Sequence, residues 1–229
     1  MESETCVPRI KEFSPAKRGA TLAQLERLGL EIPCLTAGYL LNGQGNPEEL
    51  ISYMDLAKVL RTPYIRVLGD NVIVPGTAVS DDMVIQEAKT LAKIAEEKGV
   101  TLLIETNGVY GDSARLRNVL DQIDSPAVAA LWDIHHPYRF FHEAPKTTVD
   151  HLGSYIRHVH CKDSILENDQ VKYRIMGQGD VPVFHAMLCL EDMGYEGFYS
   201  LEWVRRWDLT LEAPGIAFTQ FLRYMKHGF

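Results

Sequence analysis

The sequence predicts an α/β protein of the TIM type, a (β/α) barrel that lacks its first βα unit. Three observations lead to this fold class. Short β-branched or apolar runs alternate with amphipathic helical patterns from residue 20 to the end, which is typical of a parallel sheet. Successive runs lie 27 to 42 residues apart, close to the roughly 30 residues that a barrel spends on each βα unit. The first strand is not followed by the Gly-rich phosphate turn of a doubly wound sheet.

Six strands are expected, over residues 30–35, 64–69, 101–106, 128–134, 156–161 and 198–203. A seventh is expected near "CVPRIKE", residues 6–12, and the residues before it are too few for another strand and helix. Either the barrel is therefore incomplete, or its N-terminal βα unit lies outside this sequence.

Helices are expected between the strands, over residues 21–29, 47–61, 80–99, 113–124 and 183–194, with a final helical tail from Glu212. Asn46 and Pro47 form a typical helix start, with an N-cap followed by proline at the first position. Gly99 follows a basic-ended segment as a helix stop. No linker or change in composition divides the chain, so residues 1–229 are expected to form a single domain.

Charge and composition narrow the class of partner. The formal net charge of -8 disfavours nucleic acid, which requires clustered basic residues. The start of the chain lacks a signal-peptide layout, and no apolar run is long enough for a membrane helix, so a cytoplasmic protein is expected. The four cysteines are scattered, without a pair typical of a zinc site. The expected partner is a small molecule or another copy of the chain, because an incomplete barrel would expose strand edges.

Four residues with ligand-type side chains end four successive expected strands: Glu105, Asp133, His160 and Glu202. In a TIM barrel these ends meet at the rim where active sites are built. Three carboxylates and one imidazole suit a single divalent ion, and the set does not distinguish Mn²⁺, Mg²⁺, Co²⁺ and Zn²⁺. Any one of these residues alone would be an ordinary rim residue; the coincidence of four predicts a metal site.

Strand alternation adds two candidate substrate-binding residues on the same inward face. Asn107 is in phase with Glu105, and Lys162 is in phase with His160. Lys162 is placed either to orient a substrate hydroxyl or phosphate, or to form a salt bridge with Asp163 or another acidic residue at the rim. Weaker candidates are three arginines for anion contacts and three tryptophans for the pocket wall: Arg66, Arg174, Arg205, Trp132, Trp203 and Trp207.

At these positions the sequence resembles the xylose-isomerase-like TIM-barrel superfamily. The resemblance rests on "LLIETN", "LWDIHHP", "HVHCKD", "GQGDVP" and "GYEGFYSLEW", which occur in order between residues 101 and 203. It implies that Glu105, Asp133, His160 and Glu202 bind one divalent metal, and that the two glutamates also act as acid and base. It further implies that His136 contacts a substrate oxygen, whereas His135 packs and the following "YRFF" shapes a loop.

The expected activity is isomerisation or epimerisation of a sugar, a sugar phosphate or a related hydroxy-carbonyl compound, by proton transfer through a metal-bound enediolate. Two other enzymatic activities would use similar residues. One is a dehydratase of a cyclic polyol, and the other is a metal-dependent hydrolase like endonuclease IV. The acidic net charge argues against the latter. A non-catalytic metal- or sugar-binding barrel remains the alternative from another class. Family members commonly carry an acidic residue where this chain has Gln178.

Overall fold

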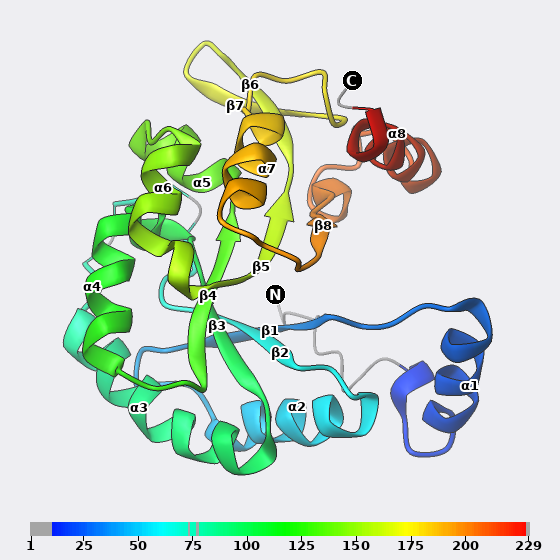
Figure 1. The fold of residues 1–229 in the computed structure, drawn as a ribbon, viewed down its shortest axis with the longest axis vertical. Coiled ribbons are helices and arrows are strands. Elements are labelled where there is room, and N and C mark those ends of the chain that lie inside the picture. Colours follow the sequence, from blue (N-terminus) through cyan, green and yellow to red (C-terminus); the bar gives the residue numbers. More distant parts are fainter. Residues whose placement is uncertain (1–10, 73, 77, 228–229) are drawn as a thin grey trace.

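The computed structural model describes residues 11–227 except 73 and 77, and its main feature is a curled sheet of six parallel strands (Figure 1). Their order in the sheet is the order in the chain, with β1 and β8 at the two edges. This is the strand order of a (β/α) barrel. The strands are β1 (Cys34–Leu40), β2 (Tyr64–Leu68), β3 (Thr101–Glu105), β4 (Val128–Asp133), β5 (Ile156–Cys161) and β8 (Tyr199–Leu201).

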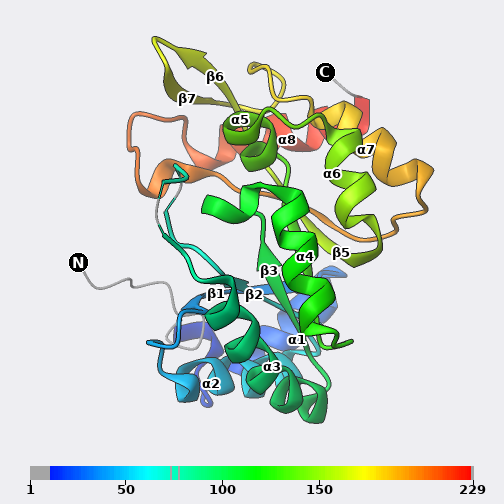
Figure 2. The ribbon, with the colours of Figure 1, turned by 90° about the vertical axis from the view of Figure 1, so that its left-hand side faces the viewer.

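Helices surround the outer face of this sheet, and neighbours in the ring touch, as α2 touches α3 and α3 touches α4 (Figures 1 and 2). Short 3-10 helices at Lys11–Phe13, Gly108–Gly111, Gly153–Tyr155 and Val204–Arg206 connect other elements. None of the helices in the described ranges is long and apolar enough to cross a membrane. The α-helices are α1 (Arg18–Leu28), α2 (Pro47–Leu60), α3 (Asp81–Lys98), α4 (Ser113–Ile123), α5 (His135–Phe141), α6 (Pro145–Leu152), α7 (Val183–Asp192) and α8 (Pro214–His227).

The helix ends follow the local sequence. The Asn46 side chain accepts a hydrogen bond from the Glu48 N–H at 3.1 Å, with Pro47 at the first helical position of α2. Ser80 accepts in the same way at the start of α3, and Gly99 ends that helix with a left-handed φ of 71°. The predicted start and stop signals are confirmed, because each provides a hydrogen-bond acceptor or backbone conformation that a helix end requires.

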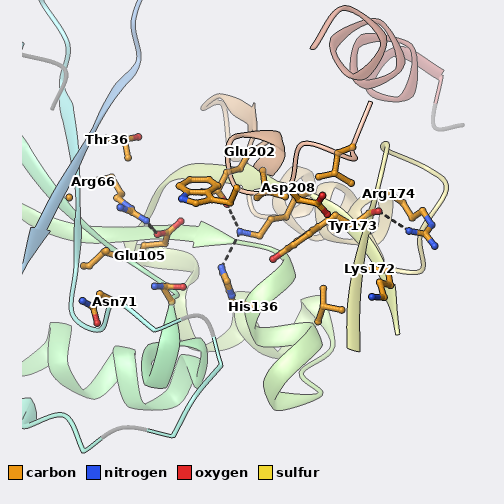
Figure 3. A pocket seen from close by; sticks show the side chains of 18 of the residues that line it. Thr36, Arg66, Asn71, Glu105, His136, Lys172, Tyr173, Arg174, Glu202 and Asp208 are labelled. Carbon is orange, nitrogen blue, oxygen red and sulfur yellow. Dashed lines mark hydrogen bonds and ion pairs between the residues drawn. The ribbon is translucent and has the colours of Figure 1, made fainter. Parts of the chain in front are cut away.

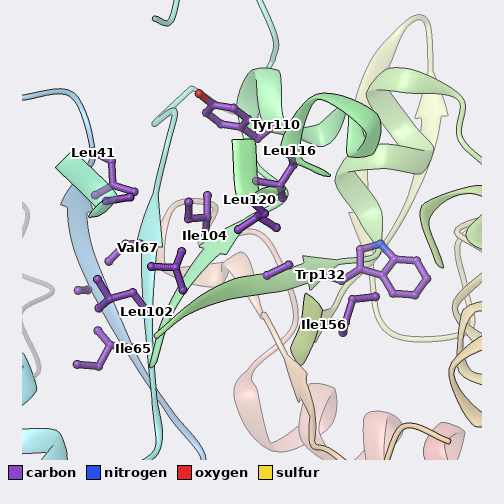
Figure 4. Packing of buried hydrophobic residues seen from close by; sticks show 14 of the residues in the cluster. Leu41, Ile65, Val67, Leu102, Ile104, Tyr110, Leu116, Leu120, Trp132 and Ile156 are labelled. Carbon is purple, nitrogen blue, oxygen red and sulfur yellow. The ribbon is translucent and has the colours of Figure 1, made fainter. Parts of the chain in front are cut away.

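The core lies between the sheet and the helices (Figure 4). Ile65, Val67 and Ile104 point outward from the strands and pack with Leu116 and Leu120 of α4 in one buried cluster. A second, smaller cluster of Leu103, Ala129 and Leu131 comes from the alternate strand positions. Strands β3 and β4 are therefore covered on both faces, which explains why their sequences are almost uninterrupted apolar runs.

Besides helix α6, for which no helix was expected, the structure differs from the sequence expectations at three elements. The first strand begins only at Cys34 and runs on to Leu40, because Pro33 has no N–H to pair. The expected loop after the fourth strand is instead helix α5, since the proline at 137 lies in the first turn, where its missing N–H costs nothing. The seventh strand falls mostly outside the described residues, and the part of its range within them is 3-10 helix.

The third difference is an antiparallel hairpin that the sequence analysis did not anticipate. It consists of β6 (Asp163–Glu167) and β7 (Gln170–Arg174), and it lies above the main sheet near α5 and α7 (Figure 1). Asn168 and Asp169 form its turn with φ angles of 51° and 60°. These residue types favour a two-residue hairpin turn, so the alternating pattern on both sides of them was an available signal.

Candidate active site

The four predicted metal ligands converge at the carboxyl end of the sheet. Glu105 and Asp133 are the last residues of β3 and β4, His160 lies near the end of β5, and Glu202 follows β8 directly. Each offers one nitrogen or oxygen atom, and these atoms all lie within 4.8 Å of one another. Because parallel strands end at the same rim, residues far apart in the sequence form one cluster.

The Lys162 ammonium group lies among these side chains. It donates a hydrogen bond of 2.5 Å to Asp133 Oδ2 and another to Glu202 Oε2, and it lies 3.0 Å from His136 Nε2. Burial alone would lower the pKa of Lys162, but the carboxylates of Asp133, Glu202 and Glu105 outweigh burial and raise it. The inward orientation expected for Lys162 is therefore found, and its salt bridges are to Asp133 and Glu202, two acidic residues at the rim, and not to Asp163.

Glu105 is held by two cationic partners. Arg66 Nε donates to Glu105 Oε2 at 2.7 Å, and His160 Nδ1 lies 3.1 Å from Glu105 Oε1. Burial would raise the pKa of Glu105, but the Arg66 guanidinium and His160 hold it well below its usual range. Arg66 was a weaker candidate for contacting a substrate anion. In the structure it pairs instead with the Glu105 carboxylate.

The remaining two carboxylates differ in their ease of ionisation. Burial and the negative charges of Glu202 and Glu105 raise the pKa of Asp133 to about 7, although Lys162 acts in the opposite direction. For Glu202, burial is outweighed by Lys162, and the pKa is lowered to about 2. Asp133 is therefore the carboxylate of the cluster whose ionisation is least favoured, chiefly because it is buried.

The donor set fits a divalent cation. Three carboxylates and one imidazole are the ligands that Mn²⁺, Co²⁺ and Zn²⁺ take readily, and a further positive charge would relieve the unfavourable ionisation of Asp133. Coordination by both Asp133 and Glu202 requires the Lys162 ammonium to give up hydrogen bonds to them.

A cavity of about 880 Å³ opens above the cluster (Figure 3). Its floor includes side chains of the cluster and their partners, and one wall comes from β1 and β2 with Asn71. The opposite side is formed by the β6–β7 hairpin and by the segment 204–211, of which the sequence analysis named only the weaker candidates Arg174, Arg205 and Trp207. The floor residues are Arg66, Glu105, His136, Lys162 and Glu202.

The predicted substrate-binding residues all line this cavity. His136 projects from the first turn of α5, and burial, together with Lys162, lowers its pKa to about 3, so the ring is neutral. The Asn107 amide nitrogen donates to the Asp70 carbonyl at 2.9 Å, which fixes the side chain at the pocket edge. His135 is fully buried, with Nε2 2.9 Å from Ser164 Oγ.

The weaker candidates are distributed differently. Arg174 lines the cavity but donates to the adjacent Tyr173 carbonyl, and Arg205 donates to the Leu209 carbonyl. Trp207 lines the cavity and is 72 % exposed, whereas Trp132 belongs to the core. Trp203 lies beside the site, where it lines a smaller pocket between β1 and β8.

Asp163 supports the loop that follows the hairpin. Its carboxylate accepts hydrogen bonds from the N–H groups of Gly177, Gly179 and Val181 at 2.9, 2.8 and 3.2 Å. A Cβ atom on Gly179 would lie only 2.0 Å from Asp163 Oδ1. The glycines of the "GQGD" motif thus allow the backbone to come close to the Asp163 carboxylate. The side chain of Gln178 is exposed.

Comparison with known proteins decides the family. A sequence model described as xylose isomerase-like TIM barrel matches residues 3–223. The chain belongs to this family. A curated relative, fructoselysine 3-epimerase of Escherichia coli O157:H7, is 27% identical over 214 residues, which are 84% of this chain and 76% of the relative.

Solved structures share the fold of this chain at low sequence identity. The 3-keto-D-glucoside 4-epimerase of E. coli superposes with a TM-score of 0.74 at 15% identity, covering 91% of this chain and 83% of that one. A xylose isomerase-like TIM barrel protein from Mycobacterium smegmatis, in complex with magnesium, gives a TM-score of 0.65 at 16% identity, covering 82% and 72%. The predicted fold class and the resemblance are both confirmed.

Proposed function

We propose that the protein is a divalent-metal-dependent epimerase or isomerase of a ketose or a related sugar derivative. The observation that carries the proposal is the cluster of Glu105, Asp133, His160 and Glu202 at the floor of a polar cavity. The epimerase activities of relatives, and the magnesium bound by one family member, support the same reaction class.

The four clustered side chains would hold the metal. When bound, the ion would supply Lewis-acid chemistry, polarising a substrate carbonyl so that the neighbouring C–H becomes more acidic. Mn²⁺, Mg²⁺, Co²⁺ and Zn²⁺ all suit this role. The pocket residues His136 and Asn107 would orient the sugar, His136 with a neutral ring that can exchange a hydrogen bond with a hydroxyl.

Two carboxylates are suited to proton transfer. Glu202 follows β8 and Glu105 ends β3, two strands that β4 and β5 separate in the sheet, so their carboxylates approach the cavity from different sides. Glu202, the more exposed of the two at 26 %, would take the proton from the carbon beside the carbonyl. Glu105, which is ionised, would relay a proton from water in the cavity to the other face of the same carbon, which inverts it. Arg66 fixes the orientation of Glu105 through Oε2.

Lys162 links this chemistry to substrate binding. In the absence of metal its ammonium neutralises Asp133 and Glu202. Once a metal takes over that neutralisation, the ammonium would be available to a substrate oxygen in the cavity that it already lines. The same side chain would then orient a hydroxyl or carry part of the negative charge that develops on the substrate.

Hydrogen exchange tests the proposal directly. The protein is loaded with Mn²⁺ and incubated in D₂O with fructoselysine, several ketoses and inososes, and deuterium is sought at the carbon beside the carbonyl. We expect incorporation with at least one substrate, reduced about 10²- to 10⁴-fold in Glu202→Gln. Glu196→Gln, which alters an exposed glutamate outside the cavity, is the matched control and should exchange like the wild type.

Two results would overturn the proposal. One is the absence of exchange with every substrate, and the other is unchanged exchange in Glu202→Gln. A product of an inosose that has lost one molecule of water would instead identify the dehydratase reaction, which uses the same base.

A further inference from the structure

The β6–β7 hairpin presents one face to helix α5. Ser164 and Tyr173 are paired across the hairpin, so their side chains leave the same face. His135 of α5 contacts both, with its Nε2 2.9 Å from Ser164 Oγ and its ring centre 5.6 Å from that of Tyr173, the planes inclined by 31°. The Tyr173 ring is therefore held between the hairpin and α5.

The base of the hairpin is fixed as well. Arg139 of α5 donates to the Ser164 carbonyl at 2.9 Å and also pairs with Asp180. Asp163, the first residue of β6, anchors the loop beyond β7 through backbone N–H groups, including that of Gly177. Contacts on both sides of Tyr173 thus determine its direction, which a solvent-exposed hairpin alone would leave free.

Tyr173 points from the hairpin into the cavity, toward His136 and the charged floor (Figure 3). Its hydroxyl group makes no hydrogen bond to any residue within the described ranges. Burial raises the pKa of Tyr173; Lys162 acts against this, and the carboxylates of Asp133 and Glu202 add to it. The phenol therefore stays protonated and retains an O–H to donate.

The O–H of a half-buried tyrosine, directed into a cavity and without a protein acceptor in the described residues, takes its acceptor from the ligand or from solvent. A ring held on both sides loses little further freedom when a ligand binds, which favours a specific contact. We propose that Tyr173 is a specificity-determining residue that donates a hydrogen bond to one hydroxyl oxygen of a polyhydroxylated ketose. This inference rests on the proposed function and adds to it a residue from an element that contributes no metal ligand.

Binding of single-deoxy sugars tests the inference. The affinities of fructoselysine, D-fructose and each monodeoxy derivative of D-fructose are measured by calorimetry on the Mn²⁺-loaded protein. We expect the wild type to bind one deoxy derivative about tenfold more weakly than D-fructose, because the acceptor is missing. In Tyr173→Phe that difference should disappear, while the Mn²⁺ affinity remains that of the wild type.

Tyr155→Phe provides a matched control. It removes a tyrosine hydroxyl that donates to Asp121, away from the cavity, so it should keep the wild-type preference among the sugars. If Tyr173→Phe also keeps that preference, the inference is overturned, and the proposed function stands provided that the wild type still catalyses exchange. If the wild type binds neither ketose, or binds every deoxy derivative as well as D-fructose, the inference is overturned, whereas the proposed function is overturned only if no substrate shows exchange.

Discussion

Strands β4 and β8 both deliver a proposed metal ligand, but they are built differently. All six residues of β4 are buried, and the strand is paired on both sides. The three residues of β8 are half-buried, and among the described strands β8 pairs only with β5. The side chain of Asp133 is accordingly 0 % exposed, whereas that of Glu202 is 26 % exposed. Apolar packing fixes one side of the site, and the other side needs additional polar links.

Those links are visible between β5 and β8. His158 Nε2 lies 2.9 Å from Ser200 Oγ, and the Glu202 N–H donates to the Cys161 carbonyl at 2.9 Å. Lys162 then connects Glu202 with Asp133. The comparison shows that one proposed metal site can combine a side chain fixed by the core with a side chain fixed by hydrogen bonds and charge.

The largest expected effect compares matched leucines in the two strands. Leu131→Ala in β4 should lower the free energy of unfolding by about 3 kcal/mol, because it leaves a cavity in a fully buried layer. Leu201→Ala in β8 should cost about 1 kcal/mol, because the side chain is only half-buried and its surroundings can adjust. Urea denaturation of the metal-free protein measures both, and equal losses would remove the basis of the comparison.

The next effect concerns the pH dependence of the link between β5 and β8. Burial, together with the nearby His160, lowers the pKa of His158 to about 3. The unfolded chain takes up a proton near pH 6.5 that the folded protein does not. The contribution of His158 to stability is thus present above pH 6.5 and decreases by about 1.4 kcal/mol per pH unit as the pH falls toward 3.

His158→Gln removes this titration but keeps a hydrogen-bonding partner for Ser200. Between pH 7 and pH 5 the variant should lose about 2 kcal/mol less stability than the wild type, as measured by urea denaturation at each pH. A variant with the same pH slope as the wild type would show that His158 is protonated in the folded protein.

The smallest effect concerns the cation between the two strands. Lys162→Met should bind Mn²⁺ about tenfold more tightly than the wild type, because the ammonium no longer occupies oxygens of Asp133 and Glu202. Lys172→Met is the control, since Lys172 lines the same cavity without pairing to a proposed ligand. Calorimetric titration measures both affinities. Weaker binding by Lys162→Met would mean that the lysine assists the metal instead of competing with it.

The same contrast explains what the sequence predicts well. Fully buried strands such as β3 and β4 produce apolar runs, and polar residues at their ends, such as Glu105 and Asp133, are conspicuous. Strand phase also placed Lys162 at the site, because alternation depends only on backbone geometry. The partners of Lys162 were not predicted, since they depend on the relative positions of residues 29 and 40 apart in the chain.

The sequence analysis did not predict the elements that depend on tertiary contacts. Helix α5 is only seven residues long, and its burial against the hairpin stabilises it more than its local sequence does. The hairpin strands are only five residues long and polar at their exposed tip, so the short alternation beside the Asn168–Asp169 turn was overlooked. The sequence analysis therefore did not predict Tyr173 as a site residue, although Tyr173 lines the same cavity as Asn107 and Lys162, which strand alternation identified.

The attachment of the β6–β7 hairpin has a consequence for protein engineering. Its base is held by Asp163 and Arg139 through main-chain atoms of the hairpin and the following loop, and these contacts do not depend on the side chains near the tip. Residues 165–172 can therefore be randomised in a library while the proposed metal ligands, which all lie on the main sheet, keep their positions. The molecule thus separates an exchangeable part, from which Val171 and Lys172 line the cavity, from a fixed part, which carries the proposed metal ligands.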